Sequence, residues 1–247
     1  MTHGQGGGRI VIMVLRSPDP SDDWPRGVPR PPSHAELWQE DEPLESDRHV
    51  SQVALLRECA QYHFRERPDV FVGGNMPVYY SSLQVRNRDF RAPDFFAVLG
   101  ARLGPREFWV VWEEEQAPDV VIEVLSDSTE QTDRGRKKQI YQNVLKVFEY
   151  YLFDFDNARI EGFRLDSERG YQPIAPGPEG RVSSLRLGLE LGVMHGVINK
   201  RESAWLRFFH PDGTLVMTGA ERAEVEALKA DALRAKLAEY EAKFGKL

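Results

Sequence analysis

The run from Val120 to Leu125 is apolar at every position except Glu123. A near-continuous apolar run of this length predicts a β-strand buried on both faces, because a strand with one wet face alternates apolar and polar residues. The next four residues, Ser126 to Thr129, are all types that favour helix N-caps, and a helical pattern continues to about Val147. The sequence therefore predicts a central strand that leads directly into a helix.

Shorter patterns surround this pair. We expect an amphipathic helix at 49–64 and short strands at 70–72, 77–80, 94–99 and 108–112. A strand at 149–153 with a hairpin partner at 159–165 follows, and three short β-like pieces lie at 185–191, 204–209 and 214–218. The acidic run Glu113 to Glu115 is expected on a solvated hairpin edge.

Composition limits the class of protein. The single cysteine, Cys59, excludes a disulfide framework and any multi-thiolate metal site, and it favours a cytoplasmic protein. No apolar run approaches the ~18 residues of a membrane span, so we expect no membrane partner. The net charge is −7, and residues 17–48 hold nine acids against three arginines. The rest of the chain is nearly neutral, so charge alone neither favours nor excludes nucleic acid.

Three regions are expected along the chain. Residues 1–48 are an acidic, proline-rich arm, residues 49–218 are the folded domain, and residues 219–247 are a charged amphipathic helix. Apolar residues in this last region mostly recur at helical spacing, at Val225, Leu228, Ala232, Ala235, Tyr240 and Phe244. This spacing has a coiled-coil character but covers fewer than four heptads. A homodimer helix, a helix docked on its own domain and a projecting tail therefore all stay open.

Two acidic residues interrupt apolar strands. Glu123 lies inside the central strand, where a buried carboxylate costs several kcal/mol unless a partner compensates it. Asp94 begins the run at 94–99, and both strands open with a Pro-Asp pair. If the two strands are neighbours, both carboxylates can reach one hard cation such as Mg²⁺, which takes oxygen ligands and keeps several waters. The structural alternatives are an ion pair of Glu123 with Arg91 or Lys137, and a turn-capping Asp94.

The following helix supplies a cationic side chain. Asp133, Lys137 and Tyr141 are spaced i, i+4 and i+8, so they lie on one helical face. A lysine beside a metal-bound water and a phosphate suits phosphodiester hydrolysis. The alternatives are a solvated Lys137, an Asp133 that favours the first helical turn, and a Tyr141 that is a core aromatic rather than a hydrogen-bond donor to the site.

At this point the sequence resembles a known family. The segments 91–96 and 118–126 look like the two strand motifs of the Uma-two family, within the PD-(D/E)XK restriction-endonuclease-like superfamily. Further matches are Ser128, Thr129, Asp133, Lys137, Tyr141, Glu149 and Tyr150, and the upstream segments 72–76 and 85–89 resemble a branch common in cyanobacteria and related bacteria. The match covers roughly residues 48–210, and the charged C-terminal helix is also typical of that branch.

The resemblance implies a fold and a site. The fold is α/β (α+β), with a restriction-endonuclease-like mixed β-sheet flanked by helices and a charged C-terminal helix. Asp94 and Glu123 are the implied metal ligands. Leu125 stands where the superfamily's lysine is expected, and Lys137 on the next helix takes the position that this family uses. Residues 143–148 also depart from a glycine-containing turn found in many members.

These observations lead to one functional prediction and two competitors. The prediction is an endonuclease dependent on Mg²⁺ (or Mn²⁺) that hydrolyses DNA. Its expected catalytic residues are Asp94, Glu123 and Lys137, and its expected metal ligands are Asp94, Glu123 and the Val124 carbonyl. The residues expected to contact phosphate are Arg86, Arg88 and Arg91. Asp133 and Tyr141 are expected to support the site. The first competitor is an inactive nuclease-like module that binds nucleic acid or protein. The second is a structural homodimer, formed through the domain or the C-terminal helix.

Overall fold

The protein is described by a computed structural model over residues 46–81, 90–102, 104–126 and 128–245. The first half of the described chain contains α2 (Asp47–His63), β1 (Val70–Gly73), β2 (Val78–Tyr79), β3 (Phe90–Arg91), β4 (Phe95–Leu99), β5 (Trp109–Val110), α3 (Val111–Glu114) and β6 (Val120–Leu125). The second half contains α4 (Glu130–Thr132), the π-helical turn η1 (Asp133–Lys137), α5 (Lys138–Asn143), β7 (Glu149–Asp154), β8 (Arg159–Asp166), β9 (Gly170–Pro173), β10 (Val182–Ser184), β11 (Leu189–Ile198), β12 (Arg201–Phe209) and α6 (Gly219–Phe244).

The largest sheet is mixed, with strand order β1-β4-β6-β7-β8-β9. β6 runs parallel to β7 and antiparallel to β4, and all six β6 residues are buried. The predicted central strand is thus confirmed, and so is the hairpin of β7 with β8. The parallel β6–β7 pair needs a crossover, which the α4–η1–α5 helix provides. The mixed α/β fold with flanking helices is as expected.

Two smaller sheets complete the fold, with orders β10-β11-β12 and β3-β2-β5. β9 and β10 were not anticipated, because Gly170–Pro173 and Val182–Ser184 have little strand propensity and become strands by pairing with longer neighbours. The strand predicted at 214–218 is wrong. Only Leu215 forms a β-bridge there, and the chain turns away at Thr218 to start α6.

The strand predicted at 108–112 is shorter than expected. β5 has two residues and gives way at Val111 to the one-turn helix α3. Within the described part of the chain it pairs with the two-residue β2 alone. Glu113 and Glu114 are therefore helical, and their expected place on a hairpin edge is wrong. Without further strand partners, the good helix propensity of glutamate decides the local structure.

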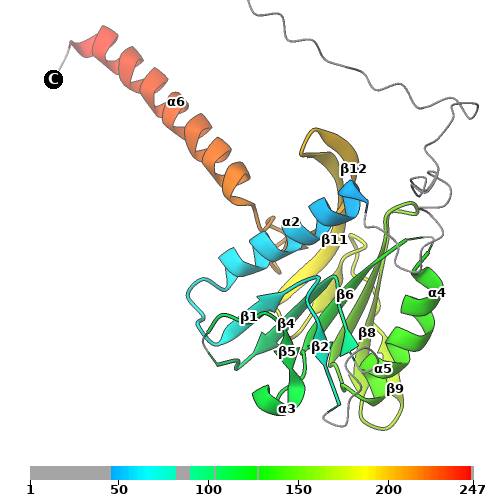
Figure 1. Ribbon diagram of the computed structural model, residues 1–247. Coiled ribbons are helices and arrows are strands. Elements are labelled where there is room, and N and C mark those ends of the chain that lie inside the picture. Colours follow the sequence, from blue (N-terminus) through cyan, green and yellow to red (C-terminus); the bar gives the residue numbers. More distant parts are fainter. Residues whose placement is uncertain (1–45, 82–89, 103, 127, 246–247) are drawn as a thin grey trace, which may run out of the picture. The chain divides into compact units, whose positions relative to one another are not determined.

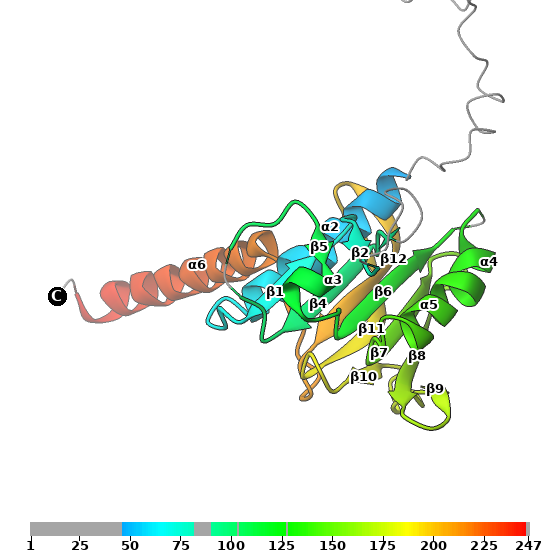
Figure 2. The ribbon, with the colours of Figure 1, turned by 60° about the horizontal axis from the view of Figure 1, so that its bottom comes forward.

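The main sheet separates two hydrophobic cores. One core joins β4, β6 and β7 through residues such as Phe95 and Ile122 to α2 and the β10-β11-β12 sheet. The other joins the opposite strand faces, with Val121 and Leu152, to Tyr141 of α5. Figures 1 and 2 show α2 on one side of this sheet and the α4–η1–α5 helix on the other. Glu123 alternates with Ile122 and Val124, so it faces the α5 side.

The predicted helix at 49–64 is confirmed as α2. The side chain of Ser46 caps it by accepting a hydrogen bond from the backbone N–H of His49. The buried amide of Gln52 exchanges two hydrogen bonds with the backbone of Leu206 on β12, each 2.9 Å long. This pairing holds the first turn of α2 in place over the sheets and so fixes the position of His49.

The final helix, α6, has no buried residue. Its first turn forms a capping box between Thr218 and Glu221, and Glu221 also accepts two hydrogen bonds from the buried guanidinium of Arg207 on β12, at 2.8 and 2.7 Å. The root of α6 is therefore attached to the domain, while the large apolar side chains further along are exposed. None of the described helices combines the length and apolar character that crossing a membrane requires.

Candidate active site

Glu123 is the centre of the site and is fully buried in β6. Its Oε1 accepts a 2.7 Å hydrogen bond from the Tyr141 hydroxyl, and its Oε2 lies 3.1 Å from Lys137 Nζ. The two partners come from the helix that follows β6, on the side of the sheet that Glu123 faces. A carboxylate in an apolar strand is thus compensated by one ammonium and one hydroxyl.

The helix bearing these partners contains the π-helical turn η1. Asp133 Oδ1 lies 2.7 Å from Lys137 Nζ, although the angle does not make a hydrogen bond. The expectation that Asp133, Lys137 and Tyr141 share one helical face is confirmed, because Lys137 contacts Asp133 while Lys137 and Tyr141 both contact Glu123. Asp133 differs from its expected role in the first helical turn, since it is buried against Lys137. π-helical turns occur frequently at functional sites.

Asp94 lies immediately before β4, and the strand register shows which residue it faces. Phe95 pairs with Ile122 in the antiparallel β4–β6 ladder, so one more step places Asp94 opposite Glu123. Residues directly opposite on antiparallel strands point to the same face, with Cβ atoms about 4.5–5.5 Å apart. The predicted neighbouring strands therefore do bring the two acids to one side of the sheet.

Two contacts hold the Asp94 carboxylate. Its Oδ2 accepts a 2.6 Å hydrogen bond from the backbone N–H of Val124, and its Oδ1 lies 2.9 Å from Nε2 of His49. Asp94 and His49 are both buried. Gly74 adds a backbone constraint, because a Cβ there would lie 2.5 Å from the Asp94 carbonyl oxygen. The loop before β2 can therefore approach Asp94 only with glycine at this position.

Burial and neighbouring charges set the proton affinity of Glu123 and of Lys137. Burial raises the pKa of Glu123 well above its usual range, and the nearby Asp94 and Asp133 raise it further, while Lys137 and the Tyr141 hydrogen bond oppose them. For Lys137, burial lowers the pKa, but the Glu123 and Asp133 carboxylates outweigh burial and raise it overall. Lys137 is thus a permanent cation at neutral pH.

The tyrosines of the site are neutral donors. Burial, with Glu123 next, raises the pKa of Tyr141 and that of Tyr150 far above the usual value. Tyr141 donates to Glu123, and Tyr150 donates a 2.9 Å hydrogen bond to the backbone oxygen of Asp133. Tyr141 is therefore both a core aromatic and a hydrogen-bond donor, which were two separate expectations.

The donor chemistry of this cluster suits a hard divalent cation. Glu123 and Asp133 share the single charge of Lys137, and Asp94 contacts the imidazole of His49. The three carboxylates, when all are ionised, therefore exceed the one permanent positive charge of the cluster. No group of three or more His, Cys, Asp or Glu side chains in the described part of the chain is placed to hold a metal ion by itself. Mg²⁺ commonly binds through one or two carboxylates and several waters, so Asp94 and Glu123 fit it.

The remaining predicted residues have mixed outcomes. Arg91 lies in β3, three residues before Asp94, and donates to the Phe90 carbonyl while its guanidinium lies 5.8 Å from the Tyr80 ring centroid. Its buried Nε has no hydrogen-bond partner among the residues that the structure describes. Arg86 and Arg88 lie outside the described residues. Val124 contributes its N–H to Asp94.

Sequence reasoning missed one residue of the cluster. His49 is not among the site residues predicted from the sequence, yet its imidazole contacts Asp94 across 45 residues of chain. The available signal was a histidine in the first turn of an amphipathic helix. That signal is weak without knowledge of which strand end the helix turn covers.

Comparison with known proteins places the chain in a family. A model of the family described as "Uma2: Putative restriction endonuclease" matches residues 24–197, more than half of the chain. A crystal structure from Anabaena variabilis, described as "a putative nuclease belonging to DUF820", is 14% identical, covers 59% of this chain and 76% of its own, and has a TM-score of 0.45. No curated protein matches. The family match supports the resemblance carried by the two strand motifs, and the chain belongs to the Uma2 (Uma-two) family of restriction-endonuclease-like proteins.

Proposed function

We propose that this protein is an endonuclease that requires Mg²⁺ or Mn²⁺ and hydrolyses phosphodiester bonds of DNA. The observation that carries the proposal is the buried cluster of Asp94, Glu123 and Asp133 around a single ammonium group, Lys137. Uncompensated buried carboxylates are unfavourable unless a further cation offsets them. Family membership supports nuclease chemistry, and the metal and the substrate are our inference.

Each residue has a proposed part in this reaction. Asp94, Glu123 and the Val124 carbonyl would hold the ion, which when bound supplies an activated water and stabilises charge on the phosphate. Lys137 orients the attacking water and neutralises charge that develops on the phosphate. Tyr141 holds Glu123 by donating to Oε1, and His49 with the Val124 N–H holds Asp94. Lys137 Nζ contacts both Asp133 and Glu123, so Asp133 fixes the lysine between them.

Arginines near the site are proposed to contact the substrate. Arg91 is half-buried beside the strand end that carries Asp94, and no ion pair of it is found in the described part of the chain. Guanidinium groups bind phosphate in a bidentate way and position the backbone of nucleic acid. Arg86 and Arg88 precede it in sequence and are proposed for the same task.

Substitution of Glu123 tests the proposal directly. In the Glu123→Gln variant the charge is lost while the shape is kept, so Mg²⁺- or Mn²⁺-dependent nicking of plasmid DNA should fall by at least about 100-fold, a typical loss when one charge-stabilising group is removed. Glu168→Gln, an exposed change on a distant turn, should cut like the wild type. Wild-type protein that is as inert as the variant on double- and single-stranded DNA with both metals would contradict the proposal.

A nuclease-like module that binds nucleic acid or protein without turnover is the second candidate. It is favoured by the fact that every oxygen of Asp94 and Glu123 already has a protein partner, as a purely structural cluster would require. Isothermal titration with Mn²⁺ separates the two candidates. Heat that disappears in Asp94→Asn supports the enzyme, whereas no binding, or binding unchanged in the variant, supports the inactive module.

We also propose that a second copy of the chain packs on α6. Ala230, Leu233, Leu237, Tyr240 and Phe244 follow the 3-4 spacing of a coiled coil, and the four large side chains are 53–72% exposed. In a parallel coiled coil, a residue that flanks the apolar stripe at position g of one helix lies beside the residue five positions later, at position e, of the other helix. Lys236 of one copy would therefore lie beside Glu241 of the other. A second α6 thus supplies a partner helix with matching apolar spacing and opposite charge.

A further inference from the structure

A small pocket lies at the other end of α2, away from the carboxylate cluster. It is formed by the last turn of α2, the turn after β12 and the first turn of α6, and has a volume of about 150 Å³. His63 is fourteen residues after His49 on the same helix, a rise of about 21 Å. We propose that this pocket binds a phosphate group, as a site separate from the proposed nuclease centre.

The charge of the lining is the first argument. Apart from Tyr62, the titratable side chains that line the pocket are all basic: His63, Arg65, His210 and Arg222. The chain as a whole carries a net charge of −7, so a pocket with two arginines and no acid runs against the average. Such a local concentration of donors and positive charge favours an anion.

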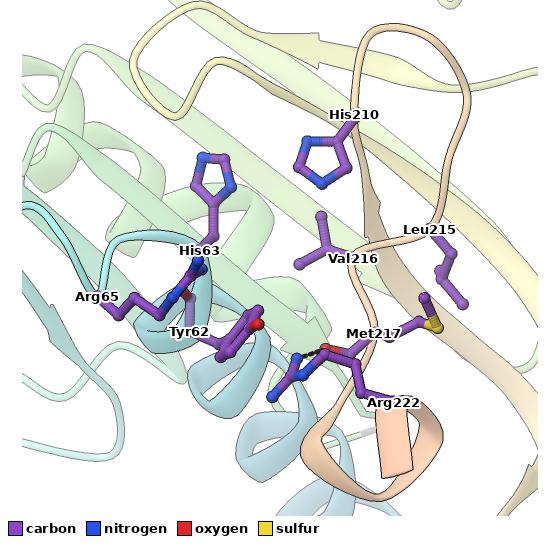
Figure 3. A pocket seen from close by; sticks show the side chains of 8 residues that line it. All are labelled: Tyr62, His63, Arg65, His210, Leu215, Val216, Met217 and Arg222. Atoms are coloured by element: carbon purple, nitrogen blue, oxygen red, sulfur yellow. Dashed lines mark hydrogen bonds between the residues drawn. The ribbon is translucent and has the colours of Figure 1, made fainter. Parts of the chain in front are cut away.

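The two arginines converge on one ring. The Arg65 guanidinium carbon lies 4.2 Å and that of Arg222 3.1 Å from the centroid of the Tyr62 ring, so both positive charges lie against the same ring. Arg222 also donates to the backbone oxygen of Met217, which fixes its orientation. Figure 3 shows Arg222 reaching toward Tyr62 from the start of α6.

Carboxylates only partly compensate this pair. Arg65 lies 3.1 Å from Glu66, and both side chains are at least half exposed, so that pair is screened by water. No ion pair of Arg222 is found among the described residues, and the nearby Glu58 accepts instead from the backbone N–H of Gly219. A bound anion would offset the remaining charge.

The two histidines form one side of the pocket. Their ring centroids are 5.5 Å apart, and Figure 3 shows the two imidazoles beside each other. Burial, and then His210, lowers the pKa of His63 below its usual 6.5, so this ring is mostly uncharged at pH 7. The ring also makes a hydrogen bond with the backbone of Leu187, which opposes this lowering. The guanidinium donors of Arg65 and Arg222 therefore carry the match to the acceptor oxygens of phosphate.

The volume limits the ligand. About 150 Å³ corresponds to roughly five water molecules at ~30 Å³ each, which holds a phosphate group but not a nucleoside. The phosphate is therefore either free or the terminal group of a larger molecule that extends out of the pocket. For this chain the relevant larger molecule is a nucleic-acid strand with a 5′-phosphate.

Titration calorimetry on the full chain tests the site. Sodium phosphate is titrated into wild type, Arg222→Gln and the matched control Arg169→Gln, whose side chain is 73% exposed on a distant turn. We expect wild type and control to bind equally and Arg222→Gln to bind about tenfold or more weakly, as loss of one charge-assisted hydrogen bond predicts. Equal affinity in all three, or no binding of any phosphate ligand by the wild type, overturns the proposal.

Two further measurements make the result decisive. Arg65→Gln removes the second guanidinium at an exposed position, so its weakened binding supports the site even if Arg222→Gln unfolds.

A trinucleotide with a 5′-phosphate is compared with the same trinucleotide without it, in the presence of EDTA. Binding of inorganic phosphate identifies the free anion, and binding of the phosphorylated trinucleotide alone identifies a strand end. The assay needs no cleavage, so failure of the proposed nuclease activity does not affect it.

Discussion

At the scale of single residues, the site depends on one ammonium group that is shared. Lys137 compensates both Glu123 and Asp133, while Asp94 has the imidazole of His49 and a backbone N–H instead. Asp94 is therefore held by α2 and β6, separately from the two acids that share Lys137 of the crossover helix. A change at His49 should alter Asp94 and leave Glu123 and Asp133 in place.

Replacement of His49 by alanine tests this division. Loss of the imidazole leaves Asp94 with only the Val124 N–H, so the carboxylate is held less firmly and Mn²⁺ affinity should fall about 10- to 100-fold, as is typical for groups that orient a metal ligand. His195→Ala, an exposed change on β11, should leave the affinity unchanged. Calorimetric titration with Mn²⁺ measures both. His49→Gln, which keeps a donor, should recover part of the affinity, whereas a merely structural histidine would show no such rescue.

At the scale of elements, the buried Arg207 of β12 attaches α6 to the domain. Burial acts to raise the pKa of Glu221, but hydrogen bonds from Arg207 and Thr218 outweigh it and hold the pKa below its usual 4.5. A lowered folded-state pKa means that the ionised form is favoured by folding. This contribution is present above about pH 4.5 and is lost as the pH falls through the folded-state pKa.

The Glu221→Gln variant should therefore be less stable in a pH-dependent way. At pH 7 we expect the free energy of unfolding to fall by about 1–3 kcal/mol, less than the ~3–5 of a fully buried pair because Glu221 is 31% exposed. The difference from wild type should shrink as the pH falls from about 4.5 through the folded-state pKa, below which Glu221 is protonated in both states. Urea unfolding at several pH values measures it, and a difference that grows in acid would contradict this assignment.

At the scale of the whole molecule, the exposed stripe on α6 is the feature that the domain itself does not cover. A chain that ends at Thr218 should sediment as a monomer at concentrations where the full chain dimerises. The double variant Leu233→Glu, Leu237→Glu should do the same. Leu228→Glu is the matched control, because Leu228, which the sequence pattern groups with this helix's apolar residues, is exposed at 65% but lies outside the 3-4 spacing of Leu233 and Leu237. A truncated chain that stays dimeric would place the interface elsewhere.

Sequence alone determined the elements whose pattern is local and strong. The apolar run around Glu123 could only be a buried strand, and the i, i+4, i+8 spacing of Asp133, Lys137 and Tyr141 put all three on one helical face. Because strand alternation and helical periodicity depend on neighbouring residues, the central part of the site was readable before any contact was known. The family motifs at 91–96 and 118–126 contain these same residues.

Only the tertiary structure decided which distant segments meet. The contact of His49 with Asp94, the burial of Asp133 and the basic pocket between α2 and α6 join residues that no local pattern connects. The short strands β9 and β10 likewise exist because long neighbours supply their hydrogen bonds. The physical reason is that packing and pairing across the chain depend on how elements are placed in three dimensions, while periodicity reports only which face of one element is apolar.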